Sequence, residues 1–284
     1  MRDSRVSLAG GRTLAYTDIG EPDWPCVFFF HGAPGSRLHL AYLEERFLAE
    51  RIRVVSLDRP AYGGSSPQPG RSMADWPPDV AALADALGIA RFGVAGHSSG
   101  GPYAVACAAL LPERVSAGIV LGGVTDMGWP GAWEGYVDSE CELMRMPDEA
   151  AAVAWCVERY GEDGKGLFSA SDFEWAEPDK AIFADGRIGP ALKLAMTEAL
   201  QRGVTGYAQD IFVQGRPWPF DPKAIAVPVH VLHGELDALV PLAHSCHTSE
   251  VIPGSTMRVL PGHGHVTTLA EIPSLASALA RSLT

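Results

Sequence analysis

The first half of the chain alternates between short apolar runs and stretches in which apolar residues have helical spacing. Residues 26–30 are continuously apolar, which is typical of a strand that is covered on both faces. Residues 75–87 place their apolar side chains at the spacing of a helix. We expect further strands at residues 52–57, 92–95 and 115–121 and further helices at residues 40–50 and 102–111. This alternation predicts right-handed crossovers and a mostly parallel sheet.

The two ends of the chain extend the same pattern. Residues 5–8 and 14–18 predict a hairpin around the turn residues Gly10 and Gly11. Near the carboxyl end we expect strands at residues 227–232 and 256–260, a helix from about Leu242 and a final helix after Ile272. The predicted fold class is therefore α/β.

The segment from residue 127 to residue 220 breaks the alternation. It contains helical patterns separated by Gly and Pro and no convincing strand. A helical insertion between two sheet strands suggests a cap over the carboxyl ends of the strands, where open α/β sheets bind their ligands. We therefore expect a core domain of residues 1–126 and 221–284, with residues 127–220 as a helical cap domain.

Composition narrows the possible partners. The net charge of −12 disfavours nucleic acid and anionic membranes, because both are polyanions. The five cysteines are scattered without a CxxC pair, and we expect Cys26 and Cys107 to be small core residues. The start of the chain shows no apolar leader, and no segment has the length of a membrane span. We expect a cytoplasmic monomer or homodimer that acts on a small molecule.

The segment Gly96-His97-Ser98-Ser99-Gly100 marks a candidate nucleophile. It follows one expected strand and precedes a helix, which is the context in which GxSxG forms a sharp turn. The two glycines allow close approach of neighbouring backbone, and the turn holds the central residue in strained φ/ψ. A Gly-rich loop without catalytic function would carry the same five letters, but the strand and helix around it favour Ser98 as the nucleophile.

A serine nucleophile needs a base and an acid that orients the base, and the carboxyl end supplies both. We predict that Asp237 is the acid and that His265 is the base, because each lies in a loop that directly follows an expected strand. Glu235 and Asp126 are competing acids, and His263 is a competing histidine that we expect to be structural. We expect His97 to point away from the site, and six further histidines to be hydrogen-bonded or exposed: His31, His39, His230, His233, His244 and His247.

Two backbone N–H groups are candidates for an oxyanion hole. The loop from His31 to Ser36 follows an apolar strand, and its two glycines let backbone approach the reacting centre. We predict that the N–H groups of Ala33 and Ser99 stabilise a tetrahedral intermediate, since Pro34 has no N–H to offer. No HExxH or other ligand pattern predicts a metal site, and we expect no cofactor.

Together these segments resemble the α/β-hydrolase superfamily, and more closely its capped branch of esterases, haloperoxidase-like enzymes and C–C bond hydrolases. The resemblance covers nearly the whole chain outside the expected cap, with the family's order of Ser, Asp and His. It is carried by residues 31–35, 58–65 and 96–100, by Asp237 with Pro241, and by Gly264-His265. It implies an eight-stranded, mostly parallel sheet, a scaffold role for residues 58–65, and acyl-enzyme chemistry. Serine at position 98 disfavours the branches that use aspartate there, and Ser99 disfavours peptide substrates.

The expected reaction is hydrolysis of a small to medium, apolar carboxylic ester. The expected cap is rich in large apolar residues, and we expect most of them to pack within the protein. His31, Trp129, Trp133 and Tyr136 are candidates for contact with substrate. We expect the acidic residues Glu140, Glu142, Asp148 and Glu149 to be solvated. One alternative keeps the triad but cleaves a C–C bond or carries out cofactor-free perhydrolysis. Another is a silent hydrolase fold that acts as a ligand receptor.

Overall fold

The computed structural model describes residues 1–169 and 172–282, so residues 170–171 of the expected cap and 283–284 of the expected core lie outside it. Its strands are β1 (Arg2–Ser7), β2 (Thr13–Ile19), β3 (Cys26–Phe30), β4 (Arg53–Leu57), β5 (Phe92–His97), β6 (Val115–Leu121), β7 (Val229–Gly234) and β8 (Thr256–Leu260). They form one eight-stranded sheet in the order β1-β2-β4-β3-β5-β6-β7-β8. β2 pairs antiparallel with β1 and with β4, and the other neighbours are parallel. The predicted hairpin and the mostly parallel sheet are confirmed.

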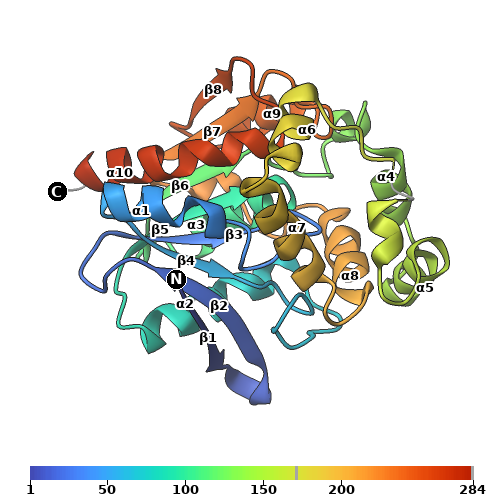
Figure 1. Cartoon of the computed structure of the whole chain (residues 1–284), viewed down its shortest axis with the longest axis horizontal. Coiled ribbons are helices and arrows are strands. Elements are labelled where there is room, and N and C mark those ends of the chain that lie inside the picture. Colours follow the sequence, from blue (N-terminus) through green and yellow to red (C-terminus); the bar gives the residue numbers. More distant parts are fainter. Residues whose placement is uncertain (170–171, 283–284) are drawn as a thin grey trace.

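Helices cover both faces of this sheet (Figure 1). Those outside the insertion are α1 (Glu44–Glu50), α2 (Trp76–Ala86), α3 (Gly101–Leu110), α9 (Leu242–Val251) and α10 (Ile272–Ser282). Side chains of α2 and α3 pack with Phe28 and Phe30 of β3, whereas α1 and α10 pack with Phe29. Successive strand residues point to opposite faces, so a continuously apolar strand fills both cores.

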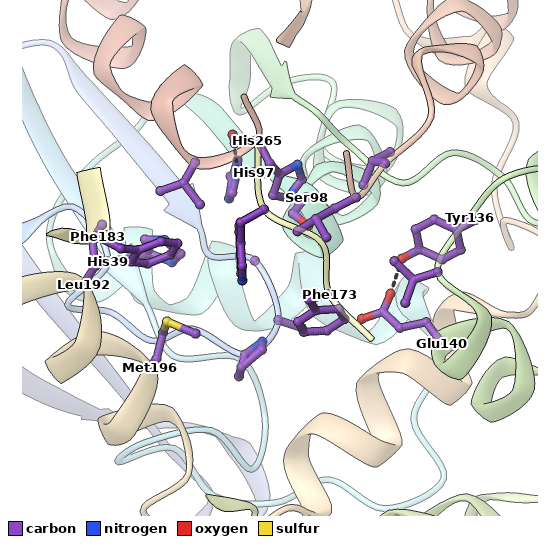
Figure 2. A pocket seen from close by; sticks show the side chains of 18 residues that line it. His39, His97, Ser98, Tyr136, Glu140, Phe173, Phe183, Leu192, Met196 and His265 are labelled. Carbon is purple, nitrogen blue, oxygen red and sulfur yellow. Dashed lines mark hydrogen bonds between the residues drawn. The ribbon is translucent and has the colours of Figure 1, made fainter. Parts of the chain in front are cut away.

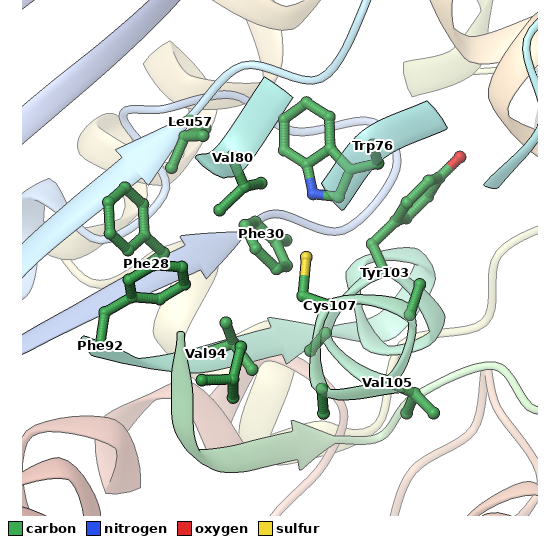
Figure 3. Close-up of a cluster of buried hydrophobic side chains, with 14 of the residues drawn as sticks. Phe28, Phe30, Leu57, Trp76, Val80, Phe92, Val94, Tyr103, Val105 and Cys107 are labelled. Carbon is green, nitrogen blue, oxygen red and sulfur yellow. The ribbon is translucent and has the colours of Figure 1, made fainter. Parts of the chain in front are cut away.

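The core on the α2 and α3 face is built around aromatic rings (Figure 3). The ring of Phe28 lies 4.5 Å from that of Phe92, and the ring of Phe30 lies 5.4 Å from that of Trp76, both edge to face. Cys107 is a buried, free cysteine within this core, and Cys26 is buried at its edge. The predicted role of these two cysteines as small core residues is confirmed.

Residues 127–220, called the insertion from here on, contain five α-helices in the part that the structure describes. These are α4 (Asp138–Met144), α5 (Glu149–Tyr160), α6 (Glu177–Ala184), α7 (Ile188–Ala199) and α8 (Thr205–Gln214). Residues 127–169 and 172–220 contain no strand, as the sequence predicts. Figure 1 shows these helices gathered at one end of the sheet.

Several element boundaries differ from the prediction by one to a few residues, and three of these differences have a local structural explanation. Residues 41–43 tighten into a 3₁₀ turn, so α1 begins at Glu44 rather than at Leu40. β5 continues to His97 because its ladder with β6 extends to the pair His97 and Leu121. β7 begins at Val229, since Pro228 has no N–H to donate to a neighbouring strand.

A buried ion cluster joins the insertion to residues 1–126 and 221–282, which carry the sheet and are called the sheet domain from here on. Asp210 of α8 is fully buried and accepts hydrogen bonds from Arg59 at 2.6 Å and from Arg71 at 3.0 Å. The hydroxyl of Tyr103 in α3 donates to the same carboxylate at 2.7 Å. The two nearby arginine charges outweigh the effect of burial and hold the pKa of Asp210 well below its usual range.

Candidate active site

Ser98 occupies the turn between β5 and α3 that the sequence predicts. Its φ is +55°, a conformation that non-glycine residues adopt rarely. A β-carbon at Gly96 would collide with the carbonyl of Gly100, and one at Gly100 would collide with the carbonyl of Phe30. The glycines are therefore required by close backbone packing, and the turn presents Ser98 at the amino end of α3.

Asp237 and His265 lie in the loops after β7 and β8 and are in direct contact. Nδ1 of His265 donates to Oδ2 of Asp237 at 2.7 Å. The other oxygen of Asp237 accepts from the backbone N–H groups of Leu239 at 2.9 Å and Val240 at 3.0 Å. The carboxylate is therefore fixed by the backbone on one side and aligned with the imidazole on the other.

The charges of this pair support each other. Burial disfavours the imidazolium of His265, but Asp237, its hydrogen bond, and the charges of Asp179 and Glu140 outweigh burial and raise the pKa of His265. Burial likewise acts to raise the pKa of Asp237, yet His265 and His233 outweigh it, so that the pKa is lowered. The arrangement favours an ionised aspartate that stabilises positive charge on the histidine.

Ser98 and His265 line the same cavity, and Figure 2 shows them next to each other in it. The cavity has a volume of about 50 Å³. Besides these two residues and Gly32, the lining is mostly apolar and aromatic, and it comes from both the sheet domain and the insertion: Ala33, Pro34, His39, His97, Tyr136, Val137, Glu140, Phe173, Trp175, Phe183, Leu192, Met196, Leu239, Val240 and Val266.

The loop after β3 passes close to Ser98. A β-carbon at Gly32 would lie 3.1 Å from Cβ of Ser98, and Ala33 lines the cavity. Ser99 is in the first turn of the helix that follows the nucleophile candidate, where backbone N–H groups have no partner within the helix. Both predicted oxyanion donors are therefore in segments that border the cavity.

Glu140 contradicts the expectation that it is solvated. It lies in α4, is only 4% exposed and lines the cavity. Its carboxylate accepts hydrogen bonds from the hydroxyls of Tyr136 and, at 3.0 Å, Tyr207 (Figure 2). Burial raises the pKa of Glu140 to about 7 in spite of these two donors. Helix periodicity alone did not reveal this, because α4 is covered on several sides by other helices of the insertion.

The expectation that His97 points away from the site is wrong. Its ring centroid lies 4.5 Å from that of His265, and its Nε2 donates to the backbone carbonyl of His265 at 3.1 Å. The loop after β8 folds over the end of β5, which brings the two imidazoles together. His39 also lines the cavity, and burial lowers its pKa to about 4. Its Nδ1 is buried without a hydrogen-bond partner among the described residues, unlike the other histidines expected to be bonded or exposed.

Three of the four predicted substrate-contact residues lie outside the cavity lining. His31 is fully buried, its Nδ1 donating to the Gly32 carbonyl at 2.7 Å and its Nε2 accepting from the Arg59 N–H at 3.2 Å. Trp129 stacks on His247 at 4.2 Å, and Trp133 stacks on Arg145. Both ring nitrogens of His31 are thus engaged in hydrogen bonds, and both indole rings are stacked on neighbouring side chains, so a role of these three residues in substrate contact stays a prediction. Tyr136 does line the cavity.

The two acids and the histidine that compete with Asp237 and His265 in the sequence lie elsewhere. Glu235 is exposed and accepts from the N–H of Gly262, whereas Asp126 accepts from the backbone of Gly128 and Trp218. His263 bonds to the carbonyl of its own loop at Pro261. Among the described residues, no group of three or more His, Cys, Asp or Glu side chains could hold a metal ion, and no helix is long and apolar enough to cross a membrane.

The loop from Asp58 to Ser65 is held in place by the hydrogen bonds of a buried carboxylate. The Asp58 carboxylate accepts from the backbone N–H of Arg37 at 2.6 Å and of Gly64 at 2.9 Å, and it also pairs with the Arg37 side chain at 2.8 Å. Burial raises the pKa of Asp58 to about 6 despite these partners. All of these hydrogen bonds and ion pairs are made between groups of the protein itself, which agrees with the scaffold role that the resemblance implies.

The sequence analysis missed two residues of the insertion that lie at the site, Glu140 and Asp179. Glu140 follows the predicted contact residue Tyr136 by only four positions, which is the one hint in the sequence that the two lie close together. Asp179 of α6 accepts from the backbone N–H of His265 at 2.7 Å, although 86 positions separate them. No local pattern announces such a contact, because it depends on how the insertion docks.

Comparison with known proteins agrees with the fold. Residues 27–274 match the family described as the alpha/beta hydrolase family. A bifunctional esterase/perhydrolase of Acinetobacter calcoaceticus is 28% identical over 94% of this chain and 95% of its own length. A non-heme chloroperoxidase of Streptomyces lividans is also 28% identical, with the same coverage of 94% and 95%. The structure of a thermophilic esterase from Thermogutta terrifontis superposes with a TM-score of 0.72 at 23% identity, over 100% of this chain and 98% of that one.

Proposed function

The chain belongs to the alpha/beta hydrolase family and is a hydrolase, and we propose that it cleaves small to medium carboxylic esters through an acyl-enzyme on Ser98. One observation carries the proposal. Ser98, whose φ is +55°, lines the same cavity as His265, and Nδ1 of His265 is hydrogen-bonded to Asp237 at 2.7 Å. A nucleophile, its base and the group that orients the base are thus supplied by three loops at the carboxyl ends of β5, β7 and β8.

In the proposed mechanism, His265 takes the proton of the Ser98 hydroxyl as the oxygen attacks the carbonyl carbon. The imidazolium that forms is stabilised by Asp237, and it then gives its proton to the leaving alcohol. Water, activated by the same histidine, hydrolyses the acyl-enzyme and restores Ser98. The raised pKa of His265 and the lowered pKa of Asp237 fit this exchange of one proton between serine, histidine and leaving group.

The proposed oxyanion hole consists of the backbone N–H groups of Ala33 and Ser99. The amino end of α3 adds a favourable dipole for negative charge beside Ser98. Backbone donors of this kind typically contribute about a hundredfold to a thousandfold in turnover. Any substitution at these two positions, except one to proline, leaves the backbone N–H group in place.

The cavity favours a short, uncharged acyl group. A volume of about 50 Å³ has room for roughly three or four water-sized groups. Most lining side chains are apolar, and the acidic lining residue Glu140 would repel a substrate carboxylate. A larger groove of about 1000 Å³ shares Phe173, Trp175, Phe183 and Met196 with the cavity, which makes it a suitable exit for the alcohol part of the ester.

We also propose that the insertion acts as a cap over the catalytic residues. The insertion supplies Tyr136, Glu140, Phe183, Leu192 and Met196 to the cavity wall, all but Tyr136 from its helices. The cap would select substrate by shape, while the sheet domain supplies the reacting groups. Residues 1–126 and 221–284 form the core in this description.

Perhydrolysis is the second candidate, favoured by the relative that is described as a bifunctional esterase/perhydrolase. The same acyl-enzyme would be attacked by hydrogen peroxide in place of water, giving a peracid. An assay of peracid formation from acetate and peroxide, run beside ester hydrolysis, separates the two activities on one preparation.

The proposal is tested with p-nitrophenyl esters of two, four, eight and twelve acyl carbons. We expect the short esters to be preferred, and Ser98→Ala or His265→Ala to lower kcat by about four to six orders of magnitude. Asp237→Asn should lower kcat by about ten thousandfold. Glu235→Gln is the matched control, because this neighbouring acid is exposed and lies outside the site. Full activity in folded Ser98→Ala would overturn the proposal.

A further inference from the structure

One side chain of the insertion contacts the loop that carries His265. Asp179, in α6, is fully buried. Its carboxylate accepts hydrogen bonds from three consecutive backbone N–H groups: from His265 at 2.7 Å, Val266 at 2.8 Å and Thr267 at 3.1 Å. These bonds orient the backbone of the histidine and of the two residues after it. All three are accepted by one side chain of the insertion.

The contact is closely fitted. A β-carbon at Gly264 would collide with the carboxylate of Asp179, so the side chain rests directly on the loop. The remaining polar groups of the loop are also bonded: the Gly264 N–H donates to Thr267 at 2.8 Å, and Thr268 donates to the His265 carbonyl at 2.7 Å. Asp179 thus completes a loop in which each of these backbone groups has a partner.

The same helix also reaches the cavity. Phe183, on α6, and Trp175, just before α6, both line it. A substrate in the cavity would therefore contact the helix that carries Asp179. If α6 is displaced, three backbone N–H groups of that loop lose their acceptor, which costs free energy for each group left buried and unpaired.

We propose that Asp179 is a positioning residue for His265, through which the docked insertion completes the catalytic triad. This inference rests on the proposed function for the role of His265 in the reaction. The contact between Asp179 and the histidine loop stands independently of the substrate. Asp179 does not touch the reacting atoms, and it acts through the orientation and the charge environment of the imidazole.

The charges around His265 allow a test that a merely structural role would not pass. Asp237, Asp179 and Glu140 act to raise the pKa of His265, and they belong to the β7 loop, α6 and α4. His97, His39 and His233 also face the site, and the pKa of each is lowered, mainly by burial. Removing the charge of Asp179 without changing its shape should therefore lower the pKa of His265.

The experiment compares Asp179→Asn with Asp148→Asn in the intact protein. Asp148 is a matched control, because it also accepts a backbone N–H in the insertion, from Ala151 at 2.8 Å, but it is exposed at the start of α5. The pKa of His265 is measured by NMR titration of the imidazole carbon-bound proton, a readout that needs no substrate. Turnover of a p-nitrophenyl ester is measured in parallel.

We expect Asp179→Asn to lower the pKa of His265, to move the acid limb of kcat/KM to lower pH and to lower kcat about tenfold to a hundredfold with little change in KM. Asp148→Asn should change none of these. An unchanged His265 pKa in Asp179→Asn, even with a lowered melting temperature, would overturn the proposal. If the wild type shows no ester turnover but Asp179→Asn shows the expected shift in the pKa of His265, only the proposed function is contradicted.

Gly264→Ala tests the same contact from the other side and does not depend on how Asp179→Asn folds. The added methyl group should push the loop away from Asp179 and lower kcat while the carboxylate is still present. In an Asp179→Ala background the space is vacant, so Gly264→Ala should cost little further activity. Equal losses from Gly264→Ala in both backgrounds would contradict the proposed contact.

Discussion

Two buried acids of the insertion, Asp210 and Glu140, differ in what surrounds them. Asp210 has two arginines and a tyrosine hydroxyl, and its pKa is held well below the usual range. Glu140 has two tyrosine hydroxyls but no cation within bonding distance among the described residues, and burial raises its pKa to about 7. Burial alone therefore does not decide the state of a carboxyl group. The first acid fixes the insertion to the sheet domain, and the second remains titratable at the cavity wall.

The largest stability effect should come from the Asp210 cluster. Asp210→Asn leaves Arg59 and Arg71 buried with an uncompensated charge, which we expect to reduce the free energy of unfolding by about 3–5 kcal/mol. Denaturant unfolding at pH 7 measures this change. A loss below about 0.5 kcal/mol, the usual range for a surface substitution, would mean that the cluster does not anchor the insertion.

The pH dependence of Asp210 sharpens the comparison. Because its folded pKa is depressed, the stability that it contributes is present above the pKa of an unfolded aspartate, about 3.9, and is lost as the pH falls through the folded pKa. Acid unfolding of the wild type should therefore be steep below about pH 4. In Asp210→Asn this part of the acid transition should be absent.

Glu140 should show the opposite sign. Its folded pKa of about 7 lies above the unfolded value of 4.5, so the folded state binds an extra proton between these values and stability falls as the pH rises through this window. Glu140→Gln removes the ionisation and should raise the free energy of unfolding at pH 8, relative to wild type, by an amount on the order of 2–3 kcal/mol. At pH 4 the two proteins should differ much less. An equal difference at both pH values would show that Glu140 is not titrating in this window.

The smallest effect is expected two residues further along α4. Glu142 is exposed and accepts a hydrogen bond from Trp155 at 3.0 Å, so Glu142→Gln should change the free energy of unfolding by less than about 0.5 kcal/mol at either pH. This variant serves as the control for Glu140→Gln, because it makes the same change on the same helix. A pH-dependent difference here would mean that the effect at Glu140 reflects helix charge rather than the cavity.

The contrast between these regions also explains what the sequence could predict. Ser98, Asp237 and His265 each follow a strand that local patterns reveal, and a parallel sheet brings the carboxyl ends of its strands to one edge. Their proximity is therefore a consequence of topology. The strands of the sheet could be predicted because each is a local apolar run. Boundary errors occurred where a ladder continued, as at His97, or where Pro228 interrupted it.

Glu140 and Asp179 could not be predicted in this way. Both lie on short helices of the insertion, and their roles depend on which helix face meets the sheet domain. A buried glutamate and an exposed one look alike in sequence when the contacts are long-range, as Glu140 and Glu142 illustrate. The contacts of His31 were hidden in the same way: both of its ring nitrogens bond to backbone groups, one of them 28 positions away.

The central claim, that Ser98 is the nucleophile activated by His265, is tested most directly by covalent labelling. The protein is treated with a fluorophosphonate probe, digested, and analysed by mass spectrometry. We expect one adduct, on Ser98, that forms rapidly in the wild type and in Glu235→Gln and is severely slowed in His265→Ala. An adduct on a different residue, or labelling of Ser98 at the same rate without His265, would contradict the account.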